Sequence, residues 1–176
     1  PVLVEGPMDA IAVTLATDGQ AVGLAPLGTS LTDEQAAQLG ALSRTPVVAT
    51  DADDAGRAAA ERDFWTLTPY GTDPRFAQLP NGSDPAELLA TGGSQQLLAA
   101  IETAGSLAST LIDQHLANER QAQAALEALR VVAAQPPARW PAGVGQIAER
   151  SQMPVSVLQS ALVSLAHTWS ADPRRA

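Results

Sequence analysis

The sequence predicts an α/β fold: a mostly parallel, four-stranded sheet flanked by helices, followed by a small all-helical unit. Three observations support this prediction. Short apolar runs alternate with helical patterns in the first part of the chain, a rhythm typical of parallel sheets. No strand pattern follows Gly92 and Gly93, and only helical patterns remain. Apolar residues make up 45% of the 176-residue chain, which indicates a globular protein with a packed core.

Apolar runs and helix signals define the elements of the first part. The predicted strands span residues 2–4, 21–25, 46–50 and 75–80. The predicted helices span residues 7–17, 32–42, 54–67 and 84–90. Pro7 suits a first helical turn, and Asp33 and Glu34 suit the positive end of a helix dipole. Ile11 and Leu15 lie one turn apart and are therefore expected to share a helix face.

The second part is predicted to be helical. Helical patterns span residues 95–103, 106–134 and 154–168, and a proline-rich stretch at 135–143 interrupts them. We therefore expect one domain at residues 1–95, a helical subdomain at 104–170, and a loose tail at 171–176 that includes Arg174 and Arg175.

One helical segment has the spacing of a helix-turn-helix. It spans residues 147–162, with Met153 and Pro154 at the turn. DNA contact is one interpretation of this spacing. The segment carries only Glu149 and Arg150 as charges, however, and this favours a helical unit that packs within the protein.

Composition excludes several classes of function. The chain has no cysteine, which excludes disulfides and fits the reducing cytoplasm, and its two histidines make a zinc site unexpected. We find no apolar run that could span a membrane. The net charge of −9 argues against a self-sufficient nucleic-acid binder, so we expect the chain alone to bind DNA weakly. Because Pro1 leads directly into a strand pattern, we expect a piece of a longer protein.

Acidic residues follow three of the predicted strands. Glu5 closes the first strand, Asp51 and Asp53 close the third, and Asp84 follows the fourth. Ligands bind at the carboxyl ends of parallel strands, so we expect these carboxylates to converge. Oxygen ligands without Cys or His suit Mg²⁺ or Mn²⁺. Asp51 and Asp53 are alternate residues of an extended segment and can share one ion.

The acids at residues 51–54 also have a purely structural interpretation. They precede a predicted helix, so Asp51 or Asp53 could cap it and Asp54 could favour its dipole. Taken alone, this stretch does not decide between a helix cap and a cation site. The acids at the other strand ends favour the cation site.

Four segments resemble, in order and spacing, the Toprim domain of bacterial DnaG-type primases. They are VEGPMDAIA, LAPLGTSLTDEQ, TDADDAGRAAAERDF and LPNGSDPAELL, and the resemblance covers about residues 1–95. It implies a Rossmann-like sheet with helices on both faces and a metal-dependent nucleotidyl-transfer site. It further implies synthesis of RNA primers from ribonucleoside triphosphates on single-stranded DNA, with a replicative helicase as a further partner.

The resemblance implies a role for each acid by its motif position. Glu5 would be the catalytic acid or base and a metal-linked glutamate, and Asp9 would support it from the following helix. Asp51, Asp53 and Asp84 would hold the divalent ions, Mg²⁺ or Mn²⁺.

The resemblance also implies roles for three glycines and one arginine. Gly6 lies in the turn after the first strand, and Gly28 with Thr29 matches the turn after the second, where a side chain would crowd the site. Gly56 would let its helix approach the sheet closely. Arg57 could contact phosphate; the alternative is an ion pair with Glu61 at helical spacing.

The sequence departs from the family pattern near Asp84. Ala86 stands where primases commonly carry a second aspartate, and Asn81 stands where an acid is frequent. One metal site is therefore expected to be weaker or lost. Two alternatives to a primase remain open: a Toprim-type nuclease, which uses the same carboxylates, and a degenerate Toprim scaffold or helicase-docking module, which Ala86 favours.

Overall fold

The computed structural model describes residues 1–28, 30–118 and 121–171. Thr29, Arg174 and Arg175, for which the sequence makes predictions, lie outside the described residues. The chain divides into two compact units, Pro1–Leu107 and Ala108–Ala176. The first unit therefore extends beyond the expected limit at residue 95, because it includes one more helix and one more strand.

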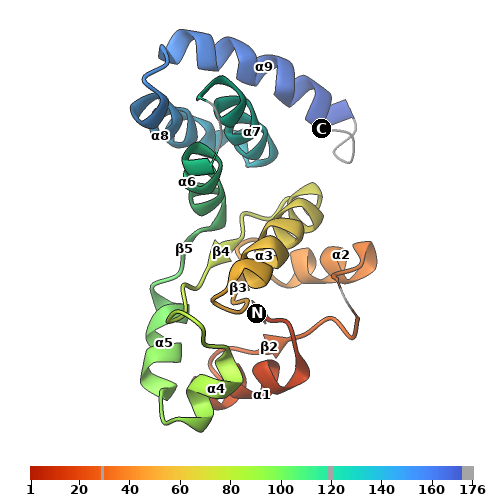
Figure 1. The fold of residues 1–176 in the computed structure, drawn as a ribbon. Helices are drawn as coiled ribbons and strands as arrows, with labels where there is room; N and C mark the ends of the chain where they lie inside the picture. Colours follow the sequence, from red (N-terminus) through yellow and green to blue (C-terminus); the bar gives the residue numbers. More distant parts are fainter. Residues whose placement is uncertain (29, 119–120, 172–176) are drawn as a thin grey trace. The chain divides into compact units, whose positions relative to one another are not determined.

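A five-stranded sheet in the order β2-β1-β3-β4-β5 forms the centre of the first unit (Figure 1). Its strands are β1 (Val2–Leu3), β2 (Gly23–Leu24), β3 (Val47–Val48), β4 (Arg75–Phe76) and β5 (Gly105–Ser106). The first four pair in parallel, as predicted, and β5 pairs antiparallel with β4. The expectation that no strand follows Gly92 and Gly93 was wrong. Both residues of β5 are exposed, so the strand has no apolar pattern that sequence analysis could detect.

Helices lie on both faces of the sheet. The first unit contains α1 (Pro7–Ala16), α2 (Asp33–Leu42), α3 (Asp54–Leu67), η1 (Thr68–Tyr70), α4 (Pro85–Ala90) and α5 (Ser94–Glu102). Helices α1, α4 and α5 contact one another, and α2 contacts α3 (Figure 1). Thr32 caps α2 by accepting the backbone N–H of Gln35, and the Gln35 side chain accepts the N–H of Thr32 in return. The buried core includes Val4, Val13 and Leu97.

Helix α1 packs against the sheet through small residues. Ala12 and Val13 are fully buried, and a Cβ added at Gly23 of β2 would lie 2.2 Å from the Ala10 carbonyl oxygen. Ile11 and Leu15 share a face, as expected, but that face points to solvent and the two side chains are 52% and 63% exposed. The buried side of α1 therefore consists of small residues, because they allow the helix to approach the sheet closely, whereas its large residues face solvent.

The second unit is helical in its described part. It contains most of α6 (Leu107–Asn118), together with α7 (Gln121–Ala134), η2 (Pro137–Arg139), α8 (Trp140–Ser151) and α9 (Val155–Ala171) (Figure 1). The proline-rich stretch does interrupt the helices, but α8 already begins within it at Trp140. Helices α7, α8 and α9 pack on one another.

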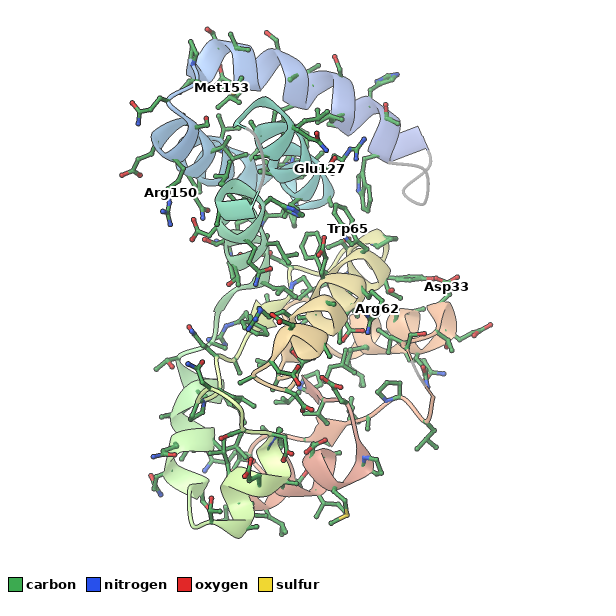
Figure 2. All side chains as sticks on the ribbon, viewed as in Figure 1. Asp33, Arg62, Trp65, Glu127, Arg150 and Met153 are labelled. Atoms are coloured by element: carbon green, nitrogen blue, oxygen red, sulfur yellow. The ribbon has the colours of Figure 1, made fainter. Side chains whose placement is uncertain are left out.

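Helices α8 and α9 form the predicted helix-turn-helix. Gln152 ends α8 in the left-handed conformation with φ of 58°, and Met153 and Pro154 lead into α9. Polar contacts fix α8 to α6: Arg150 pairs with Asp113 at 2.9 Å, and the Gln146 amide donates to the Ser109 carbonyl oxygen. Figure 2 shows Arg150 and Met153 in this unit. Among the described residues, no helix combines the length and apolarity needed to cross a membrane.

Candidate functional site

Two acids that are far apart in the sequence meet where β1 and β3 end. The backbone N–H of Asp51 donates to Oε1 of Glu5 at 3.2 Å. The pairing of the two strands leads directly to this contact, because the N–H of Ala49 donates to the Leu3 carbonyl oxygen at 2.8 Å. The parallel register thus brings Glu5 and Asp51 to the same edge of the sheet.

The electrostatics of Asp51 show that further acids face this point. Burial, followed by the negative charges of Glu5, Asp9, Asp84 and Asp53 in that order, raises the pKa of Asp51 to about 6. Every neighbouring charge acts in the same direction, so the carboxylates repel one another. A positive ion at this edge would relieve that repulsion.

Asp9 holds the backbone at the base of this acidic site. Its side chain is buried, Oδ2 accepts the N–H of Gly6 at 3.0 Å, and Oδ1 accepts the N–H of Ala86 at 3.2 Å. Asp9 therefore ties the start of α1 to the start of α4, residues that lie 77 positions apart. Both carboxylate oxygens are used, which supports a positioning role for Asp9 over direct ion binding.

Asp53 and Asp84 act as helix caps. Oδ1 of Asp53 accepts the N–H of Gly56 at 2.7 Å, and Oδ1 of Asp84 accepts the N–H of Glu87 at 2.6 Å. The sequence left open whether Asp51 or Asp53 caps the helix; in the structure the cap is Asp53. Each cap occupies one oxygen, which leaves the other carboxylate oxygen for a second ligand.

Backbone contacts join the two acidic loops. The N–H of Ala52 donates to the Ser83 carbonyl oxygen, and the N–H of Gly82 donates to the Ala52 carbonyl oxygen, each at 3.2 Å. These bonds hold the loop after β3 beside the loop that precedes α4. The positions of Asp51 and Asp84 are thus fixed by main-chain geometry and not by the acids alone.

The donor chemistry of the site fits a hard divalent cation. The facing groups are carboxylates, and no cysteine exists in the chain. In the described part of the chain, however, no three acidic or histidine side chains come close enough together to hold an ion. Helix capping explains part of the separation between the carboxylates, because one oxygen of Asp53 and one of Asp84 point toward backbone N–H groups.

The glycines differ in the space around them. A Cβ at Gly56 would lie 2.0 Å from the Asp51 carbonyl oxygen, so α3 approaches the acidic loop as closely as glycine allows. A Cβ at Gly6 would lie 3.0 Å from Oδ2 of Asp9. A Cβ at Gly28 would meet nothing within 4 Å among the described residues, and Gly28 lines the cavity that includes Glu5. The expectation that a side chain there would crowd the site stays a prediction.

Arg57 forms an exposed ion pair. It pairs with Asp54, one turn earlier on α3. The pair with Glu61, which the sequence offered as the structural alternative, stays a prediction. The Asp54 side chain is 96% exposed, so this pair contributes little to stability. A phosphate contact by Arg57 stays a prediction.

Asp63 is a site residue that sequence analysis missed. Its pKa is raised to about 7, mainly by burial; the positive charge of Arg62 opposes this rise, and the negative charge of Glu5 adds to it. Asp63 lines a cavity of about 240 Å³ together with Val4, Glu5, Pro26, Gly28, Ser30, Ala59 and Arg62. Helical spacing offered a signal, because Asp63 lies between Ala60 and Leu67 of the buried stripe of α3.

Known proteins resemble the chain in both sequence and fold. The Toprim-like family model matches residues 2–89. A DNA primase of Clostridium acetobutylicum is 35% identical over 117 residues, which cover 66% of this chain and 19% of that protein. A DNA primase domain from Pseudomonas aeruginosa has a TM-score of 0.75 at 27% identity, covering 94% of this chain and 53% of that one.

A third similar structure is that of a DnaG primase catalytic domain bound to single-stranded DNA. It has a TM-score of 0.73 at 26% identity, and the match covers 88% of this chain and 52% of that one. The chain spans about a fifth of the length of the curated primases and about half of these solved domains. The family model covers half of the chain and includes every acid of the candidate site; the chain belongs to the Toprim-like family.

Proposed function

We propose that this chain is part of the catalytic core of a DNA primase, which joins ribonucleotides into RNA primers on single-stranded DNA in a divalent-metal-dependent reaction. One observation carries the proposal: Glu5 and Asp51 meet at the ends of β1 and β3, and Asp9, Asp53 and Asp84 lie near enough for their charges to raise the pKa of Asp51. The similarity to DNA primases in sequence and fold supports it.

The carboxylates at the strand ends support a cation site there. Asp51, Asp53 and Asp84 would hold Mg²⁺ or Mn²⁺, while Asp9 keeps the loops in place. When bound, such an ion neutralises phosphate charge and stabilises the attacking and leaving oxygens in phosphoryl transfer. The capping bonds of Asp53 and Asp84 would orient their carboxylates for this task.

Glu5 would accept the proton of an attacking hydroxyl. Its Oε1 is held by the N–H of Asp51, so the carboxylate is oriented by the backbone. The side chain is exposed and lines the cavity beside α3. A hydroxyl bound there could pass its proton to Glu5 while its oxygen attacks the α-phosphate of a nucleoside triphosphate; the bond between the α- and β-phosphates breaks and pyrophosphate leaves.

Primer synthesis tests the proposal. The experiment uses a polypeptide that includes this chain and spans a whole primase catalytic core, with single-stranded template, ribonucleotides and Mg²⁺. We expect primers from the parent protein and a loss of at least about 100-fold in Asp51→Asn, since charge stabilisation of this kind is commonly worth that much. The exposed Asp18→Asn is the matched control and should keep activity.

Two other results would contradict the proposal. Nicking of supercoiled DNA without primer synthesis would assign the chain to the Toprim nucleases, which use the same carboxylates. A protein with neither activity would be a scaffold, and this is the alternative that Ala86 favours, because an alanine at that position provides only its N–H, which binds Asp9.

A further inference from the structure

The cavity beside Glu5 has the size of a sugar. Its volume is about 240 Å³, and it is formed between the end of β1, the loop after β2 and α3. Pockets for whole drug-sized ligands usually measure about 300–1,000 Å³. The cavity can therefore enclose one compact group, while the remainder of a larger ligand would extend outside it.

The charges around the cavity favour a neutral group that carries hydroxyls. Two carboxylates, Glu5 and Asp63, line it together with the hydroxyl of Ser30. A phosphate inside would meet two negative charges, whereas a hydroxyl can donate a hydrogen bond to either carboxylate. Arg62 also lines the cavity, and Figure 2 shows it on α3. Its guanidinium could neutralise a phosphodiester attached to the bound group.

Asp63 is a half-buried carboxylate that lines the cavity. Among the described residues, none donates a hydrogen bond to its side chain. Buried carboxylates are normally satisfied by such bonds. Burial is also the largest cause of the raised pKa of Asp63, and the negative charge of Glu5 adds to the rise. A ligand hydroxyl would supply the missing donor.

We propose that this cavity binds the ribose of the nucleotide whose hydroxyl attacks, and that Asp63 is a positioning residue that accepts a hydrogen bond from the 2′-hydroxyl of that ribose. The identity of that nucleotide rests on the proposed function. Acidic side chains recognise ribose hydroxyls in the same way in dinucleotide-binding folds. Because Glu5 lines the same cavity, a ribose held by Asp63 would lie next to the group that takes its proton.

The test is a nuclear magnetic resonance titration of the isotope-labelled chain with adenosine 5′-monophosphate, 2′-deoxyadenosine 5′-monophosphate and inorganic phosphate. We expect the ribonucleotide to shift the amide signals of Ser30, Ala59 and Asp63. The deoxynucleotide should bind about three- to tenfold more weakly, the range expected for one lost hydrogen bond. Inorganic phosphate alone should leave these three signals in place.

Three variants of α3 sharpen the titration. Asp63→Ala should remove the difference between the two nucleotides, and Ala59→Leu should abolish binding because it fills the cavity while Asp63 stays. Glu61→Ala is the control, since Glu61 belongs to the same helix but does not line the cavity. If Asp63→Ala fails to fold, Asp63→Asn keeps the side-chain shape and should still weaken ribonucleotide binding.

Equal binding of the two nucleotides, or binding that Ala59→Leu leaves unchanged, would overturn the inference. The same holds if phosphate alone reproduces the shifts, since the cavity would then recognise an anion. The proposed function fails separately, through absent primer synthesis. In that case discrimination between the two sugars would still establish a ribose site in this chain.

Discussion

At the scale of single residues, the candidate site is a set of carboxylates held by main-chain N–H groups. Glu5 accepts the N–H of Asp51, Asp53 accepts that of Gly56, and Asp9 accepts those of two residues. These bonds fix the acids near one another despite their repulsion. Burial, followed by this repulsion, raises the pKa of Asp51 to about 6.

Asp51→Asn is expected to stabilise the metal-free chain at pH 7. The pKa of Asp51 rises from 3.8 in the unfolded chain to about 6 in the folded one, so its favourable contribution is present below pH 4 and lost as pH rises to 6. Because the side chain is only partly buried, solvent screens its charge and the gain should be only about 0.5–1 kcal/mol at pH 7. Urea unfolding at pH 7 without metal measures it, and a loss of stability would contradict this account.

Asp63→Asn is expected to show a larger effect with the same sign. Burial raises the pKa of Asp63 from 3.8 to about 7, so the folded state loses stability as pH rises from about 4 to 7. The variant should be more stable than the parent by about 1–3 kcal/mol at pH 8 and nearly equal to it at pH 4. Urea unfolding at both pH values tests this. Asp18→Asn, an exposed control, should show no such pH-dependent difference.

At the scale of elements, each acid depends on where a helix begins. Helices α3 and α4 start at their aspartate caps, and α3 approaches the acidic loop closely because Gly56 has no Cβ. Helix α1 begins at Gly6 and is tied to α4 through Asp9. The site is thus assembled from the N-terminal ends of three helices, at the edge where the parallel strands end.

Gly56→Ala is expected to destabilise the chain, whereas Gly28→Ala is not. The new Cβ at Gly56 would meet the Asp51 carbonyl oxygen at 2.0 Å, a backbone atom that cannot move without disturbing β3. Overpacking of this kind costs about 1–3 kcal/mol. At Gly28 the Cβ meets no described atom within 4 Å, so the change should stay within about 0.5 kcal/mol. Thermal unfolding of both variants tests this difference in stability. Equal melting temperatures would contradict the close approach of α3 to the acidic loop.

The sequence predicted the elements that carry strong local signals. Helix α3 was expected at residues 54–67 and lies at Asp54–Leu67, because an aspartate cap precedes a regular stripe of apolar residues. The four parallel strands were located, but each is only two residues long, shorter than its apolar run. The strand β5 was missed because pairing with β4, not apolar patterning, defines it.

The sequence predicted less of the site's detail. Glu5 and Asp51 converge because β1 and β3 are neighbours in the parallel sheet. The alternation of strands and helices in the sequence was enough to predict this convergence. It could not show that Asp9 uses both oxygens on the backbone, because one of its partners lies 77 residues away. Asp63 was missed for a similar reason: only the folded chain brings α3 beside Glu5.

At the scale of the whole molecule, the first unit carries the acids and the second supplies a separate helical core. The chain's net charge of −9 includes the acids of the site, so a divalent ion would offset part of it. The chain spans about a fifth of the length of the known primases that it matches.

Calorimetric titration of this chain with Mn²⁺ is the most direct test of the claim that the strand ends form one cation site. The account predicts saturable binding by the parent chain, a loss of at least about tenfold in affinity in Asp51→Asn, and unchanged binding in Asp18→Asn. Equal Mn²⁺ binding by all three proteins, or none by the parent, would show that the converging carboxylates do not hold a metal.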